Sequence, residues 1–176
     1  DEVVYFKENI LEKYNLKVDN IVIGGTERQD SVYNGLKSLE DTNTDIVLIH
    51  DGARPFVNQD IIRRCMQEVQ KYQACVVGMP VKDTIKIADE EGYAKQTPDR
   101  KNVWMIQTPQ TFSYALIYEA YEEMLKTEDT AITDDAMVLE RIKGKKSKLI
   151  EGSYRNIKIT TPEDLLIANV YLQHPE

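Results

Sequence analysis

The stretch Asp45–Asp51, DIVLIHD, decides the fold class of this chain. Its four consecutive aliphatic residues, Ile46–Ile49, are flanked by polar residues, which is typical of a strand buried on both faces. Cys75–Pro80 and the shorter run Ile21–Ile23 predict further buried strands. Between Ile46–Ile49 and Cys75–Pro80, the segment Ile61–Val69 carries apolar residues at helical spacing, so the chain alternates strand and helix.

This alternation predicts an α/β fold with a Rossmann-like, mostly parallel sheet flanked by helices. Lys148–Ile150 and Asn156–Thr160 predict two short strands near the end of the chain. Thr161 before Pro162 is a strong start signal for a last helix. Because no internal repeat and no linker interrupts the pattern, we expect residues 1–176 to form one domain.

The region of about residues 82–106 breaks the alternation. Thr84–Ile87 alternates polar and apolar side chains, Asp89–Gly92 reads as a turn, and Asn102–Ile106 returns. This pattern predicts an antiparallel β-arm that protrudes from the parallel sheet.

Composition excludes several classes of protein. The chain has 176 residues, 41% of them hydrophobic, which suffices for one core and excludes low-complexity disorder. It carries 22 Lys and Arg against 30 Asp and Glu, a net charge of −8, so nucleic acid is not an expected partner. No apolar run is long enough to span a membrane. The two cysteines match neither a disulfide framework nor a zinc site, and we expect a cytoplasmic protein.

Polar residues follow the predicted strands. Gly24 and Gly25 follow the first strand, Asp51 and Arg54 the second, and Lys158 lies in the last. In open α/β sheets, ligands bind beyond the carboxyl ends of the strands. Glycine, carboxylate and cationic groups gathered there suit a phosphate ester and its divalent cation.

Each of these residues also has a purely structural interpretation. The glycines can form a tight turn, Asp51 can cap a turn, and Arg54 and Lys158 can be solvated surface residues. The chain contains neither a P-loop motif nor the G-x-G-x-x-G fingerprint. From the residues alone, we therefore infer only an α/β domain that handles a phosphorylated small molecule.

Six motifs, in unbroken order from Gly24 to Ala168, resemble those of one enzyme family. They are GGTERQDSV (24–32), VLIHDGARPF (47–56), PVKDTIK (80–86), TPDRKNVWMIQTPQTF (97–112), ITDDA (132–136) and GSYRNIKITTPEDL (152–165). The family is 2-C-methyl-D-erythritol 4-phosphate cytidylyltransferase, of the non-mevalonate isoprenoid pathway. The resemblance implies a fold of the nucleotidyltransferase type. It also implies that CTP and methylerythritol phosphate give CDP-methylerythritol and pyrophosphate, with Mg²⁺ as cofactor.

The resemblance also implies roles for individual residues. Arg100 and Lys158 would be catalytic, because they match the pair that holds the attacking phosphate. The substrate would be bound by Asp51, Arg54, Thr84, Thr108 and Thr133; the nucleotide by Gly24, Gly25, Ser31 and Ala53; and the metal by Asp51. Since Arg100 lies on the arm, which crosses to a second subunit in this family, the resemblance implies a homodimer with shared sites.

Two alternatives remain open, the first of them because of a departure from the family pattern. The family begins with a strand and a glycine-rich loop that carries an arginine and a lysine, and nothing before Gly24 corresponds to them. We therefore expect the N-terminal part to be missing from this chain. A non-catalytic module that binds nucleotide and dimerises is one alternative function. Ribitol-5-phosphate cytidylyltransferase, a sister family, is the other.

Overall fold

The computed structural model describes residues 2–127 and 132–175. The chain divides into two compact units, Asp1–Thr44 and Asp45–Glu176, and each is described by itself.

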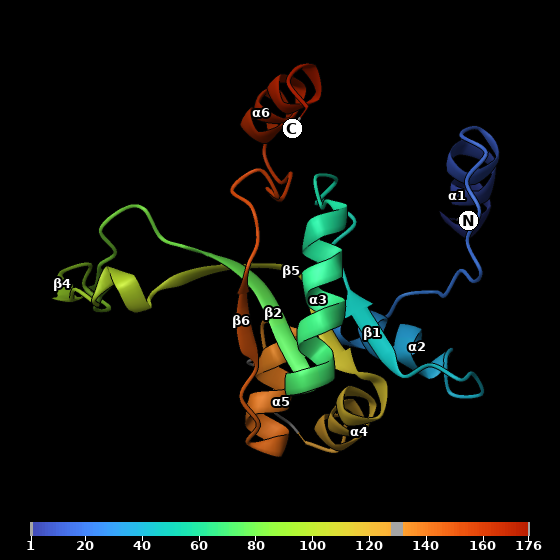
Figure 1. Ribbon diagram of the computed structural model, residues 1–176, viewed down its shortest axis with the longest axis horizontal. Helices are drawn as coiled ribbons and strands as arrows, with labels where there is room; N and C mark the ends of the chain where they lie inside the picture. The colour runs from blue at the N-terminus through green and yellow to red at the C-terminus, as the bar shows by residue number, and fades with distance from the viewer. Residues whose placement is uncertain (1, 128–131, 176) are drawn as a thin grey trace. The chain divides into compact units, whose positions relative to one another are not determined.

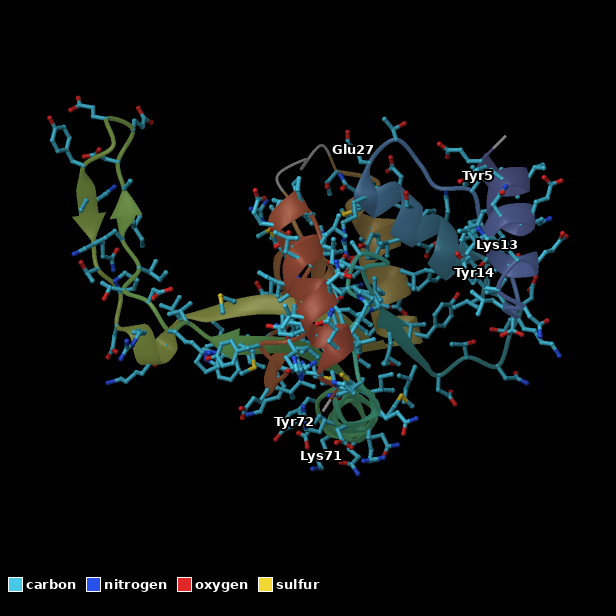
Figure 2. The ribbon with its side chains drawn as sticks, turned by 90° about the horizontal axis from the view of Figure 1, so that it is seen from above. Tyr5, Lys13, Tyr14, Glu27, Lys71 and Tyr72 are labelled. Atoms are coloured by element: carbon cyan, nitrogen blue, oxygen red, sulfur yellow. The ribbon has the colours of Figure 1, made fainter. Side chains whose placement is uncertain are left out.

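The first unit is helical in its described part. It contains α1 (Glu2–Phe6), the π-helical turn η1 (Lys7–Glu12) and α2 (Arg28–Lys37), with Glu27 at the start of α2 (Figure 2). The strand expected at Ile21–Ile23 does not form. No described residue of 2–44 lies in a strand, so this run has no ladder partner within its own unit.

A four-stranded sheet organises the second unit, in the order β1 (Ile46–Ile49), β5 (Trp104–Ser113), β2 (Ala74–Pro80), β6 (Lys148–Glu151). β2 and β6 pair in parallel, whereas β5 is antiparallel to both β1 and β2. Three strands therefore share one direction, and the expectation of a mostly parallel sheet flanked by helices is confirmed. The antiparallel strand is nevertheless central, not peripheral.

Helices cover both faces of this sheet (Figures 1 and 2). On one face, α3 (Gln59–Tyr72) buries Ile61, Cys65 and Val69 against Cys75 and Val77 of β2. On the other face lie α4 (Tyr114–Met124) and α5 (Asp135–Lys143). Because side chains alternate along a strand, the buried run of β2 supplies apolar groups to both layers.

The region of the predicted arm contains a small antiparallel pair, β3 (Ile87–Ala88) with β4 (Ala94–Gln96), followed by the 3-10 turn η2 (Arg100–Asn102). This hairpin lies away from the four-stranded sheet (Figure 1). Of the expected return, Asn102–Ile106, the last three residues form the start of the ten-residue strand β5 and pair antiparallel with residues 78–80 of β2. The same strand therefore leaves the arm and crosses the middle of the sheet.

The last helix, α6 (Pro162–Gln173), begins as expected. The Asp164 amide donates to Oγ1 of the N-cap Thr161, and the Asp164 carboxylate accepts from the Thr161 amide. The strand expected at Asn156–Thr160 does not form. This segment instead bonds to the loop after β1, for example through the Ile159 amide and the Ala53 carbonyl at 2.8 Å.

Candidate active site

Two cations converge on one carboxylate at the carboxyl end of β1. Nε of Arg54 and Nζ of Lys158 both lie 3.2 Å from Oδ2 of Asp51. Arg54 also donates from its Nη1 to the carbonyl of Asn156 at 2.8 Å. The loop after β1 and the segment before α6 are thereby joined by charged groups, at the edge where ligands bind in open α/β sheets.

The environment of Asp51 keeps its carboxyl group ionised at neutral pH. Burial acts to raise its pKa, but the hydrogen bonds and charges of Lys158 and Arg54 outweigh burial and hold the pKa below its ordinary value. The Asp51 and Arg54 side chains are 15% and 12% exposed, whereas Lys158 is 45% exposed. Lys158 therefore presents a charged group to solvent, and an ammonium has three donors of which Asp51 takes one.

The loop that carries Asp51 is fixed to β5 through Thr108. The Asp51 amide donates to Oγ1 of Thr108 at 3.0 Å, and Oγ1 lies 2.9 Å from Nδ1 of His50. Nε2 of His50 lies 3.0 Å from the Arg54 carbonyl, which can only accept, so Nε2 carries the proton. The Thr108 hydroxyl and Nδ1 of His50 share a second hydrogen bond, and the loop is closed around its two charged residues.

In the first unit, the structure brings Gly24, Gly25 and Ser31 together. The Gly25 amide donates to Oγ of Ser31 at 3.0 Å. A Cβ atom at Gly24 would lie 2.8 Å from the same oxygen, and one at Gly25 would collide with the Asp30 side chain. The close approach of this backbone to the start of α2 therefore requires glycine. Their nucleotide role stays a prediction.

The remaining predicted residues make other contacts. Arg100 is exposed in η2, where its Nη1 donates to the Lys82 carbonyl at 2.8 Å. Thr84 is exposed between β2 and β3, and Thr133 is exposed just before Asp134, the N-cap of α5. Ala53 contributes its carbonyl, which accepts from the Ile159 amide.

Sequence reasoning gave no site role to two buried amides, Gln107 and Asn156. They are 7% and 0% exposed and bond to each other, Nδ2 of Asn156 donating to Oε1 of Gln107 at 3.3 Å. Their signal in the sequence was weak, because a polar residue among apolar ones also reads as a solvent-facing strand position.

The family model described as 2-C-methyl-D-erythritol 4-phosphate cytidylyltransferase matches residues 3–174. The chain belongs to this family. Membership makes it a nucleotidyltransferase of the non-mevalonate isoprenoid pathway, as its motifs indicated.

Curated members of the family are similar to almost the whole chain. The cytidylyltransferase of Clostridioides difficile is 54% identical over 172 residues, which are 98% of this chain and 71% of that protein. The one from Caldanaerobacter subterraneus is 51% identical over 174 residues, 98% of this chain and 75% of that protein.

Solved structures of family members share the fold. The 4-diphosphocytidyl-2C-methyl-D-erythritol synthase of Anaerococcus prevotii superposes with a TM-score of 0.88 at 40% identity, covering 99% of this chain and 76% of that one. The Francisella tularensis cytidylyltransferase has a TM-score of 0.77 at 34% identity, covering 88% and 73%.

The described residues of this cytidylyltransferase chain supply few metal ligands. No three of their His, Cys, Asp and Glu side chains are grouped to hold an ion. Asp51, whose Oδ2 already faces two cations, can offer one carboxylate. That donor set fits Mg²⁺ only as an ion held mainly by phosphate oxygens and water, which is how proteins commonly bind it with nucleotides.

Among the helices of residues 2–127 and 132–175, none has both the length and the apolar character that crossing a membrane demands.

Proposed function

We propose that this chain transfers a cytidylyl group from CTP to 2-C-methyl-D-erythritol 4-phosphate, releasing pyrophosphate, in a cytoplasmic homodimer. A phosphate oxygen of methylerythritol phosphate forms a bond to the α-phosphorus of CTP. The bond from that phosphorus to the bridging oxygen breaks, and its electron pair leaves with pyrophosphate. No covalent enzyme intermediate is needed, so positioning and charge stabilisation supply the catalysis.

The observation that carries this proposal is the convergence of Arg54 and Lys158 on Asp51. The carboxylate holds both cations in place before substrate arrives, so little reorganisation is required when negative charge develops. Lys158, being half-exposed, would contact the attacking phosphate. Arg54 and Thr108 would shape the pocket for the methylerythritol phosphate, and Thr133 would add a hydroxyl.

From the motifs that carry the resemblance, Gly24, Gly25, Ser31 and Ala53 would bind the cytidine. Backbone groups suit this role, because main-chain amides and carbonyls can read the amino and carbonyl edge of cytosine. Mg²⁺, with Asp51 as its single protein ligand, would neutralise charge on the CTP phosphates.

Dimerisation through the arm would complete the site. Several large apolar side chains are exposed along the arm and the start of β5: Ile87 (45%), Tyr93 (70%), Met105 (46%) and Ile106 (40%). A second copy that covered them would remove apolar surface from water. Arg100 and Thr84, which the arm carries, would then serve the partner's substrate.

The experiment that tests this function is pyrophosphate release from CTP and Mg²⁺, with methylerythritol phosphate and ribitol 5-phosphate in parallel. We expect release with methylerythritol phosphate. Release with ribitol 5-phosphate alone would move the protein to the sister activity, and silence with both would support a non-catalytic nucleotide-binding module. Light scattering of the same sample tests the dimer.

A further inference from the structure

Asn156 is fully buried beside the Asp51 cluster and has no assigned role. Asn156 is 0% exposed, and its main-chain carbonyl accepts a 2.8 Å hydrogen bond from Nη1 of Arg54. Two residues later, Lys158 reaches Asp51. Asn156 therefore lies where the segment that carries Lys158 meets the loop that carries Arg54.

The carboxamide of Asn156 has one orientation that its neighbours accept. Nδ2 donates to the Thr108 carbonyl at 2.9 Å, and a carbonyl cannot donate in return. Nδ2 also donates to Oε1 of Gln107, whose Nε2 donates to the Ser153 carbonyl at 2.7 Å. The chain of bonds runs in one direction and fastens the turn at residues 153–156 to β5.

The turn packs tightly on β5 immediately before this point. A Cβ atom at Gly152 would collide with Oε1 of Gln107 and with Cγ1 of Val77. Because even a methyl group has no room there, the turn cannot move closer to the sheet. The carboxamide of Asn156 prevents it from moving away.

Burying the Asn156 side chain has an energetic cost. Oδ1 of Asn156 has no hydrogen-bond partner among the described residues. A buried polar atom without a partner costs about 1–3 kcal/mol, so the residue is not the one that packing alone would favour. The two bonds from Nδ2 are what the side chain contributes in return.

We propose that Asn156 is a positioning residue of the transfer reaction, which fixes the spacing of Arg54 and Lys158 on Asp51 without touching substrate. The proposal rests on the proposed function. The bonds of the Asn156 side chain fix the position of its own main-chain carbonyl, which accepts from the Arg54 guanidinium. They thereby also fix the short segment that leads to Lys158. A displacement of about 1 Å at a positioning group can cost 10²-fold in rate.

A double-mutant cycle tests the proposal. We expect Asn156→Ala to lower kcat by about 10²-fold with a smaller change in KM for methylerythritol phosphate. In a Lys158→Ala background, the same substitution should lower kcat by a clearly smaller factor, because only Arg54 of the two groups that it positions remains. Equal losses in both backgrounds would overturn the proposal.

Stability and structure provide a second line of evidence. Tyr121→Phe is a matched control, since it removes another buried hydrogen bond, from Tyr121 to Asp135, in the α4–α5 layer. It should lower the melting temperature and leave kcat unchanged. Asn156→Ser keeps a hydroxyl donor and is the milder variant if Asn156→Ala does not fold; it should recover part of kcat.

Crystal structures of the variants separate this proposal from the proposed function. We expect the Lys158–Asp51 and Arg54–residue 156 contacts to be lost or lengthened in Asn156→Ser or Asn156→Ala while the sheet is retained. Contacts that remained at 3.2 and 2.8 Å would overturn the positioning role whether or not the protein is active. Failure of wild-type pyrophosphate release would instead overturn the function alone.

Discussion

Nζ of Lys158 lies 3.2 Å from Oδ2 of Asp51, although the two residues come from opposite ends of the folded unit's sequence. The carboxylate neutralises part of the lysine charge before substrate binds and gives the flexible side chain a fixed resting position. A phosphate that displaced this contact would meet an ammonium already directed into the site.

Replacing Lys158 with alanine should lower turnover by at least about 10²-fold, the size of effect seen when one charge-stabilising donor is removed. The fold should persist, because the side chain is 45% exposed and contributes no core. Pyrophosphate release measures the loss, and Lys146→Ala, at another exposed lysine, is the control. A variant with near-normal kcat would refute the role.

Arg54→Lys should be strongly impaired despite keeping the charge. The guanidinium donates from Nε to Asp51 and from Nη1 to the Asn156 carbonyl. A lysine ammonium cannot reproduce this planar arrangement of two separate donors. We expect a loss of about tenfold or more in kcat/KM together with about 1–3 kcal/mol of stability. Arg63→Lys, on the exposed face of α3, should change neither quantity. If Arg54→Lys had the same kcat/KM as Arg63→Lys, the role of Arg54 as a donor to both Asp51 and the Asn156 carbonyl would be contradicted.

Mixing inactive Arg100→Ala and Lys158→Ala subunits should restore activity if sites are shared across a dimer. Random exchange would yield about a quarter of the sites intact, since half the dimers are mixed and each mixed dimer has one complete site. The assay is pyrophosphate release after joint refolding. Absence of any recovery, with mixed dimers demonstrated, would assign each site to one subunit.

The ionisation of Asp51 should stabilise the fold at neutral but not at acid pH. Its pKa is lowered from the ordinary 3.8, since Lys158 and Arg54 outweigh burial. The folded state therefore releases this proton more readily than the unfolded state, and the contribution is present above the ordinary pKa and lost as pH falls through the lowered one. The free energies of unfolding of wild type and Asp51→Asn, measured in urea, should differ most at pH 7, and the difference should shrink as the pH is lowered below 3.8. A constant difference would argue against the charge contacts.

Thr161→Ala should lower the free energy of unfolding by about 1 kcal/mol, because Oγ1 of Thr161 accepts the Asp164 amide at the first turn of α6. Thr161→Ser keeps the cap and should be close to wild type. Thermal unfolding followed by circular dichroism compares the two. Identical melting of the alanine and serine variants would show that the cap contributes nothing.

These two parallel strands were predictable because strands buried in a sheet read as runs without charged or polar side chains, as in Ile46–Ile49 and Cys75–Pro80. The central strand β5 was not predictable beyond Ile106. Its middle, Gln107–Thr111, is mostly polar and yet buried, and Gln107, Thr108 and Gln110 bond to residues distant in sequence: Gln110, for example, bonds to the Asp134 carboxylate and to the Ala136 amide. Such pairing is set by tertiary structure and leaves no local pattern.

The residues of the candidate site were likewise predictable only in part. Asp51 and Arg54 were found because they follow a strand, and the structure places Lys158 and Thr108 beside them. His50 is hydrogen-bonded through both ring nitrogens, to the Arg54 carbonyl and to the Thr108 hydroxyl. Asn156 was placed in a strand, because the alternation of residues 156–160 resembles one. The segment instead bonds to the loop after β1, which the sequence pattern does not encode.

The course of β5 limits how the gene can change in length. Strand β5 begins at the arm and carries Thr108 into the sheet. One residue inserted between Trp104 and Thr108 would therefore turn the Thr108 side chain to the opposite face of the sheet. Deletions there would pull the arm out of register with β2. Residues 89–92, at the tip of the hairpin, carry no such constraint. Homologous arms should therefore vary in length at the tip, and a designer who wishes to graft a tag or label should choose it.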